Sequence, residues 1–175
     1  MELNFCPVCG ARLSLRPHPT EAPTLWCERC RDWRFPLYSC AVSGVLLDKS
    51  GEKLLMIWQY GEPEPVLVAG YVDKGETAEA ALLREVREEL GMTARSPRFL
   101  GSHYYAPSQT LMLNFLAVLE EDAARPNAEV DAWAWVPVAE VRSQVRPGGL
   151  AQVLPRSCSG SGTARRLLTN SIFSS

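Results

Sequence analysis

Apolar residues between positions 78 and 90 return every three or four residues, which is the period of a helix that buries one face. The members of this stripe are Leu82, Leu83, Val86 and Leu90. Thr77 is a suitable N-cap for such a helix, and Gly91 is the residue type expected just after its last turn. The sequence therefore predicts an amphipathic helix over residues 78–90.

Most of the remaining apolar residues form short runs between turn-forming residues, which predicts β-strands. The expected strands cover 40–47, 54–60, 66–69, 98–105, 110–120 and 130–136. Two further helices are expected, at 138–145 and 163–172. Strands around one central helix, with a second helix later, are typical of an α/β domain in which a mixed sheet lies between helices.

Four of the six cysteines stand in two Cys-x2-Cys pairs, Cys6 with Cys9 and Cys27 with Cys30. This is the spacing of a structural Zn2+ site made by four thiolates. A disulfide framework and a redox-active pair are the alternatives. Gly10 directly follows the first pair, where it can adopt the positive φ that such a turn requires.

Residues 1–36 are therefore expected to form a small β zinc ribbon, and residues 37–175 a second domain. Because no linker separates the two units, we expect them to pack together. Cys40 lies in an apolar strand pattern and is predicted to be a core residue. Cys158 lies in a loop rich in serine and glycine.

The composition is that of an ordinary soluble globular protein, with 46% apolar and 22% charged residues. The net charge of −2 gives no support to a broad basic surface for nucleic acid. No apolar run approaches the roughly 18 residues of a transmembrane helix. The first residues, MELNFCPVCG, lack the basic and apolar regions of a signal peptide, so the sequence predicts a cytoplasmic protein.

Three carboxylates share one flank of the predicted helix, because Glu85, Glu88 and Glu89 are three and four residues apart. Their repulsion requires a cation, and Arg84 can pair with one of them but not with all three. Mg2+ prefers carboxylate oxygens, and the Gly-bounded turn 70–75 leads toward a helix N-terminus, where anions are favoured. Together these features indicate metal-assisted hydrolysis of a phosphoric anhydride. The alternative is a solvated acidic helix face.

The same stretch resembles the Nudix box, G-x5-E-x7-R-E-U-x-E-E-x-G-U with U apolar, at every fixed position. The matching residues are Gly70, Glu76, Arg84, Glu85, Val86, Glu88, Glu89, Gly91 and Met92. The resemblance implies a Nudix fold, which is a mixed β-sheet sandwiched between helices. It also implies hydrolysis of the diphosphate bond in a nucleoside diphosphate linked to another moiety, and a backbone carbonyl of Gly70 close to the catalytic metal.

The resemblance implies a role for each charged residue of the box. Glu85 and Glu89 would be the main ligands of a catalytic Mg2+ or Mn2+, and Glu88 would be a further ligand or the general base. Glu76 and Arg84 would form the ion pair that braces the loop against the helix.

A four-cysteine ribbon ahead of a Nudix domain is similar to the NADH pyrophosphatases and to a shorter group of FAD and ADP-ribose pyrophosphatases. A chain that starts at the ribbon is more like the shorter group. The stretch Ser102–Thr110 resembles in part the motif that follows the box in NADH pyrophosphatases, although its prolines and phenylalanine are missing from their places. Tyr105 and Gln109 are the substrate-binding candidates in it. Tyr104 and Tyr105 could stack on a base or nicotinamide ring, or be ordinary aromatics at a strand end.

Two later segments complete the resemblance. Gly162–Leu168 is similar to the segment that holds the adenosine end in the NADH pyrophosphatases, so Ala164 is a further substrate-binding candidate. The neighbouring Arg165 or Arg166 would meet phosphate or belong to a solvated helix face. Glu129 falls where those enzymes carry an additional carboxylate near the metals; otherwise it is a surface acid before a strand.

The sequence thus predicts a pyrophosphohydrolase for NADH, FAD or ADP-ribose that depends on Mg2+ or Mn2+ and releases a nucleoside monophosphate. One alternative is a nucleotide-sensing Nudix module whose ribbon contacts nucleic acid or protein; another is a hydrolase that removes nucleoside triphosphates. The expected partner is a small nucleotide. Neither a membrane nor nucleic acid is expected, except the capped end of an RNA, and the resemblance implies a homodimer.

Overall fold

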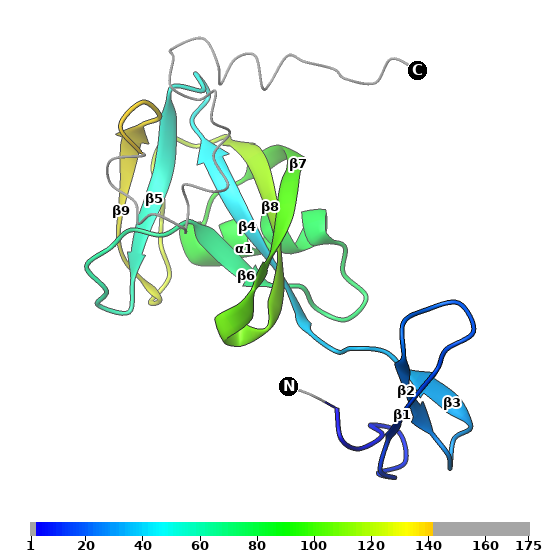
Figure 1. The fold of residues 1–175 in the computed structure, drawn as a ribbon. Helices are drawn as coiled ribbons and strands as arrows, with labels where there is room; N and C mark the ends of the chain where they lie inside the picture. Colours follow the sequence, from blue (N-terminus) through cyan, green and yellow to red (C-terminus); the bar gives the residue numbers. More distant parts are fainter. Residues whose placement is uncertain (1–2, 142–175) are drawn as a thin grey trace, which may run out of the picture.

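The computed structural model describes residues 3–141 (Figure 1). Its elements form a small three-stranded sheet at the N-terminus and a larger six-stranded sheet with one α-helix. In chain order they are β1 (Ser14–Arg16), β2 (Thr24–Cys27), β3 (Asp32–Arg34), β4 (Ser39–Leu47), β5 (Lys53–Gln59), β6 (Val68–Tyr71), α1 (Ala78–Leu90), β7 (Ala94–Tyr105), the 3-10 turn η1 (Ala106–Ser108), β8 (Thr110–Leu119) and β9 (Val130–Pro137).

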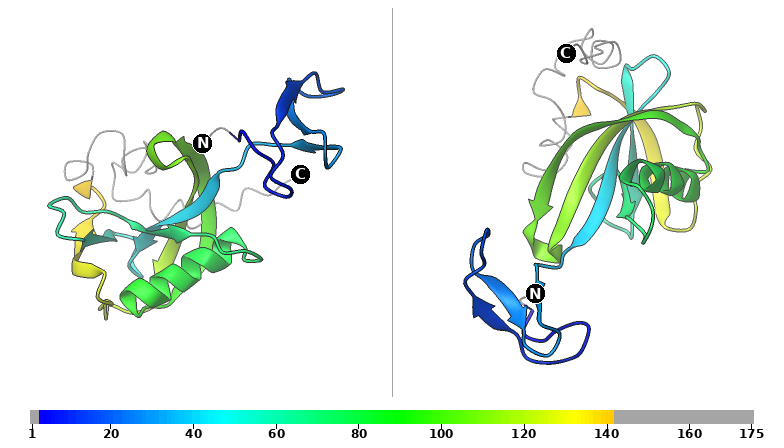
Figure 2. Two further views of the ribbon diagram at one scale, coloured as in Figure 1. Left: turned by 90° about the horizontal axis from the view of Figure 1, so that it is seen from below. Right: turned by 90° about the vertical axis from the view of Figure 1, so that its right-hand side faces the viewer.

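The larger sheet is mixed. Its strand order is β7-β8-β4-β5-β9, and β4 and β8 are parallel whereas the other pairs are antiparallel. β6 pairs with the first half of β4, from Ala41 to Gly44, and β5 pairs with β4 only where Leu47 meets Leu54. β4 is therefore paired with β6 along its first half and with β5 only at its end. The helix α1 crosses one face of the sheet beside β6 (Figure 2).

The core fills both faces of β4, because successive side chains of a strand point to opposite sides. Val42 and Leu46 belong to the cluster that contains the buried stripe of α1. Val45 and Leu47 belong to a second cluster on the other face, with residues from β5, β8 and β9. This double burial explains the continuous apolar run in the sequence of β4.

The structure confirms the predicted helix, which spans Ala78–Leu90. Thr77 accepts a hydrogen bond from the backbone N–H of Ala80, and Gly91 has a φ of 62°. The six expected strands are present with ends shifted by up to four residues, and the mixed sheet is confirmed. Residues 138–140 form a turn where a helix was expected, and Val141 is helical; 142–145 and the whole of 163–172 lie outside the described residues.

The N-terminal sheet stands apart from the larger one (Figure 1). Neither hydrophobic cluster of the second domain includes a residue before Val42. Phe35, Leu37 and Tyr38, which connect the two units, are each more than half exposed, at 54%, 62% and 56%. The prediction that the ribbon packs on the second domain is therefore wrong, because these apolar side chains find no covering partner within residues 3–141. No helix in that range is long and apolar enough to cross a membrane.

Candidate functional site

The acidic flank of α1 presents its three carboxylates at very different depths. Glu89 is buried, with 4% of its surface exposed. The side chain of Glu85 is 14% exposed and that of Glu88 is 58% exposed. The exposed fraction therefore rises from Glu89 to Glu85 and then to Glu88, as expected for a helix flank with one side toward the sheet and the other toward solvent.

Arg84 connects this flank to the loop before the helix. Its guanidinium donates two hydrogen bonds of 3.0 Å to the two carboxylate oxygens of Glu76, which lowers the pKa of Glu76. It also bonds Glu85 at 2.7 Å, Glu88 at 3.2 Å and the backbone oxygen of Tyr71 at 2.9 Å. Arg84 was expected to pair with one helix carboxylate but not with all three; it pairs with two, Glu85 and Glu88, because a guanidinium has five N–H donors in a planar fork.

Gly70 lies directly against Glu85. A methyl group built on its Cα would lie 1.9 Å from Oε1 of Glu85, far inside van der Waals contact. Only glycine leaves room there for the carboxylate, and Gly70 is held in place by its register with Val42 of β4. Gly70, the first residue of the stretch that resembles the Nudix box, must therefore be glycine because it contacts the carboxylate of Glu85, fifteen residues later.

Glu89 has two polar neighbours from outside the helix. Nε2 of Gln59, at the end of β5, donates a hydrogen bond of 3.0 Å to its carboxylate. Burial raises the pKa of Glu89 to about 7, and the negative charges of Glu85, Glu129 and Glu88 act in the same direction. The structure therefore brings Glu129, which stands just before β9, into the electrostatic field of the helix carboxylates.

Sequence reasoning missed Gln59 and Tyr60. Gln59 ends the apolar run of β5 and pairs with Val130, so it lies beside the turn that carries Glu129. Tyr60 has a positive φ of 58°, and its hydroxyl lies 3.5 Å from a carboxylate oxygen of Glu129. A polar residue that closes a buried strand was the available signal for Gln59.

The carboxylates Glu85, Glu88, Glu89 and Glu129 have the donor chemistry that Mg2+ or Mn2+ requires. Their oxygens are not gathered into one metal-sized cluster, however, because Arg84 holds Glu85 and Glu88 to itself. To bind a cation jointly, these two side chains must turn away from the guanidinium.

A cavity of about 460 Å3 lies beside Gly70, between β4, β6, β7 and β8. Its lining is mainly apolar, with Tyr71 and Tyr105 at its rim and His103 and Asn114 among its polar groups. Tyr105 is thus part of a cavity that shares Gly70 with the acidic flank, although Ser43 and Asn114 line it from the sheet face opposite α1. Gln109 is not among the lining residues and instead ends η1 with a φ of 51°. Ala164 and Cys158 lie outside the described residues, whereas Cys40 is half-buried in β4.

The four paired cysteines come together in the N-terminal sheet. Their sulfurs lie within 4.8 Å of one another, with 3.9 Å between Cys6 and Cys30 and 3.5 Å between Cys9 and Cys27. Zinc–sulfur bonds of about 2.3 Å in a tetrahedron place sulfurs roughly 3.8 Å apart, and a disulfide requires about 2.05 Å. These distances fit zinc and exclude a disulfide among the four residues.

The zinc-type site also has a charged neighbour. Nε of Arg34 donates a hydrogen bond of 3.2 Å to Sγ of Cys6. Burial by itself raises the pKa of Cys6, but the bond from Arg34 and the backbone N–H groups of Val8 and Cys9 outweigh it and lower that pKa to about 6. Gly10 has the expected positive φ of 73°.

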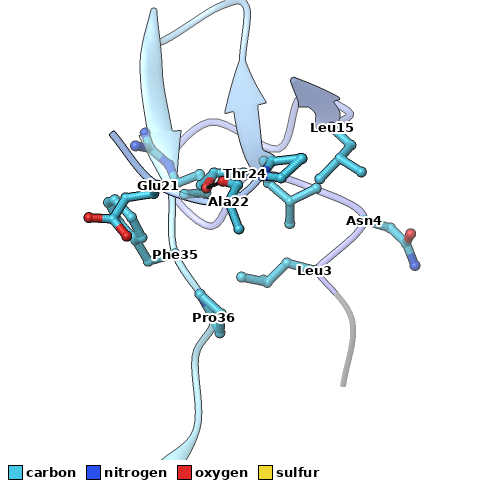
Figure 3. A pocket seen from close by; sticks show the side chains of 11 residues that line it. Leu3, Asn4, Leu15, Glu21, Ala22, Thr24, Phe35 and Pro36 are labelled. Carbon is cyan, nitrogen blue, oxygen red and sulfur yellow. Dashed lines mark hydrogen bonds between the residues drawn. The ribbon is translucent and has the colours of Figure 1, made fainter. Parts of the chain in front are cut away.

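A second cavity, of about 600 Å3, lies on the ribbon itself (Figure 3). Leu3, Leu15 and Pro36 are among its apolar lining residues, and Glu21 is its one carboxylate. It shares no residue with the acidic flank of α1.

Comparison with known proteins decides the family. The model of the NUDIX domain matches residues 37–156. This chain belongs to the Nudix family. The matched Nudix domain contains the helix, Gly70, Gln59 and Glu129 described above.

Curated relatives of this Nudix protein include an NAD-capped RNA hydrolase NudC from Vibrio parahaemolyticus, 28% identical over 87% of this chain and 58% of the relative. A protein of the same name from Mycobacterium tuberculosis is 33% identical over 65% of this chain and 37% of the relative. The chain thus spans little more than half the length of the first of these relatives, and less of the second.

Solved structures support the Nudix fold. A NUDIX hydrolase from Nitrosomonas europaea has a TM-score of 0.61 at 19% identity, covering 82% of this chain and 80% of that one. The NUDIX domain of Shewanella oneidensis NrtR, solved with ADP ribose, has a TM-score of 0.59 at 19% identity, covering 82% and 94%.

Proposed function

We propose that this protein is a pyrophosphohydrolase that cleaves the diphosphate bond of a nucleoside diphosphate linked to a second moiety. The observation that carries the proposal is a link through Gly70, which lines the cavity and contacts Glu85, whose charge acts on Glu89 together with those of Glu88 and Glu129. Carboxylates suit the cation that accompanies a diphosphate, and an apolar cavity with few polar groups suits the organic part of such a substrate.

Nudix hydrolases use divalent metals, and here Glu85, Glu89, Glu88 and Glu129 would hold Mg2+ or Mn2+. Such a cation supplies positive charge for the diphosphate oxygens and makes a bound water more acidic. Arg84 has a separate, positioning role, because its hydrogen bonds to Glu76 and to the backbone oxygen of Tyr71 join the helix to the preceding segment.

In the reaction, the oxygen of a water molecule bonds to one phosphorus of the diphosphate. The bond from that phosphorus to the bridging oxygen breaks, so a nucleoside monophosphate and the phosphate of the second moiety are released. A carboxylate of the acidic flank accepts the proton of the attacking water, and Glu88 is a candidate because most of its side chain is open to solvent.

The substrates to test first are NADH, FAD and ADP-ribose. The curated relatives are named NAD-capped RNA hydrolases, and one Nudix neighbour was solved with ADP ribose. A short RNA with an NAD cap therefore belongs in the same panel. Tyr105 at the rim of the cavity supports a substrate with an aromatic ring, whereas the role of Gln109 remains a prediction.

The domain division is part of the proposal. Residues 1–36 would form a ribbon closed by zinc on Cys6, Cys9, Cys27 and Cys30, and residues 37–175 the Nudix hydrolase domain. A site closed by four thiolates stabilises structure and leaves no coordination position for substrate. The homodimer implied by the family resemblance is tested by the molar mass in solution.

The test is hydrolysis of the substrate panel with Mg2+, comparing the wild type with Glu89→Gln. Loss of a main metal ligand is expected to lower kcat/KM by at least about a hundredfold. Glu79→Gln is the matched control, because Glu79 lies on the same helix but is exposed in its first turn. Unchanged turnover in Glu89→Gln would contradict the assigned roles.

The sensor alternative has its own outcome in this experiment. If the wild type binds ADP-ribose with Mg2+ but hydrolyses no member of the panel, the protein is a nucleotide-binding module. Turnover of nucleoside triphosphates alone would keep the chemistry and change the substrate class.

A further inference from the structure

The floor of the cavity beside Gly70 carries a buried polar chain within an otherwise apolar part of the sheet. Ser43 and Asn114 interrupt the apolar runs of β4 and β8, and the two residues are register partners. They are buried, at 6% and 4% exposed, yet both line the cavity together with His103 of β7. Buried polar groups of this kind are retained at a cost unless they are hydrogen-bonded.

The hydrogen bonds of Asn114 fix the orientation of its amide. Its Nδ2 lies 3.1 Å from the backbone oxygen of Gly101, which can only accept, so this atom must be the nitrogen. Its Oδ1 accepts a hydrogen bond of 2.7 Å from the hydroxyl of Ser43. The reversed amide would place two acceptors face to face at Gly101.

This orientation determines the tautomer of His103. The same Nδ2 lies 3.2 Å from Nδ1 of His103, and its second hydrogen is the one available to that ring nitrogen. Nδ1 must therefore accept, and in a neutral imidazole the proton then resides on Nε2. Within residues 3–141, Nε2 has no hydrogen-bond partner, while His103 lines the cavity.

We propose that His103, held as the Nε2–H tautomer by Asn114 and Ser43, is a specificity-determining residue. It donates a hydrogen bond to an acceptor on a ring of the substrate, such as a carboxamide or ring carbonyl oxygen. Apolar Ala41, Leu67 and Met112 offer contact surface for such a ring. This inference deepens the proposed function by naming the substrate class. The identity of the ligand as a substrate rests on the proposed function, whereas the tautomer of His103 does not.

The tautomer is tested by long-range 1H–15N NMR of the imidazole rings, which is tractable because the chain has only two histidines, His18 and His103. His18→Phe assigns the signals. The proton is expected on Nε2 of His103, and Asn114→Asp, which replaces the donor by an acceptor, is expected to move it to Nδ1. A proton on Nδ1 in the unaltered chain would overturn the proposal.

Ligand selection is tested by the dissociation constant of NADH with Mg2+, measured by calorimetry in a Glu89→Gln background so that NADH is not consumed. Adding His103→Phe is expected to weaken binding about tenfold, and His103→Gln, which keeps a donor, is expected to restore it to within about threefold. His18→Phe on the ribbon is the matched control and should leave binding unchanged. Equal affinity with histidine and phenylalanine at position 103 would overturn the proposal.

These measurements separate the inference from the proposed function. If the wild type hydrolyses no substrate of the panel while His103→Phe still weakens NADH binding, the enzyme assignment fails and the role of His103 stands. If hydrolysis is found but His103→Phe leaves NADH binding unaltered, the enzyme assignment stands and the role of His103 fails.

Discussion

The ribbon and the Nudix domain are stabilised in different ways. The ribbon has three strands of three or four residues, and its most buried side chains are those of two of the paired cysteines, Cys6 and Cys27. The Nudix domain closes two apolar clusters around β4, and no carboxylate of its acidic flank belongs to either cluster. In the first region the four cysteines are the core, whereas in the second the carboxylates are carried by a core built elsewhere.

The largest effect should come from Cys27→Ser, which removes one of the four proposed zinc ligands of the ribbon. Zinc binding in small modules contributes roughly 10–16 kcal/mol, so the ribbon should unfold while the Nudix domain stays folded. Trypsin should then cut rapidly at the ribbon arginines, such as Arg12 and Arg29, and leave a resistant fragment. Simultaneous loss of the Nudix domain would show that the two regions share their stability.

A matched disruption of the Nudix core is Leu82→Ala. Leu82 is fully buried in the cluster under α1, and truncation of such a leucine costs about 3 kcal/mol. The melting temperature should fall by about 10 °C, while the zinc content stays unchanged. Leu83→Ala, on the same helix but only partly buried, should have a smaller effect. A loss of zinc in Leu82→Ala would show that the ribbon and the Nudix domain do not fold independently.

Within the ribbon, Arg34→Gln should weaken zinc binding without abolishing it. Groups that hydrogen-bond metal ligands typically change affinity about 10- to 100-fold, and Arg34 is the donor that lowers the pKa of Cys6. Competition with a chromogenic chelator should show this loss, and the pH at which zinc is released should rise. Arg29→Gln, an exposed change in the same unit, should behave like the wild type.

The smallest effect concerns the acidic flank in the absence of divalent cations other than zinc. The pKa of Glu89 is raised from its ordinary 4.5 to about 7, so the folded state favours the protonated acid. Its stabilising contribution is complete below pH 4.5 and is lost as the pH rises through 7. Glu89→Gln should therefore raise the melting temperature at pH 8 by about 3 °C.

Thermal unfolding at pH 5 and pH 8 checks this expectation, with Glu79→Gln as the control on the same helix. If the wild type and Glu89→Gln lost the same stability between the two pH values, the flank would not oppose folding. A stabilised but inactive variant would instead show that the acidic flank serves catalysis at the expense of stability.

Local features were predictable because neighbouring residues produce them. The span of α1 follows from the period of its apolar residues and from Thr77 and Gly91 at its ends. The four-cysteine cluster follows from the spacing of its pairs. In both cases the interacting groups lie within one element or in two short motifs of fixed spacing.

Contacts between distant strands could not be read in this way. Gln59 meets Glu89 because α1 packs against the face of β5 that carries Leu55 and Ile57. The exposure of Leu37 and Tyr38 was also unpredictable, because an apolar residue is covered only if another element arrives to cover it.

The sequence by itself determined the family, the helix that carries the carboxylates and the cysteine ligands, because each depends on residue types at fixed short spacings. The tertiary structure alone decided that Asn114 stands between Ser43 and His103, from three different strands. Strand register sets such contacts, and register depends on how the whole sheet buries its apolar faces.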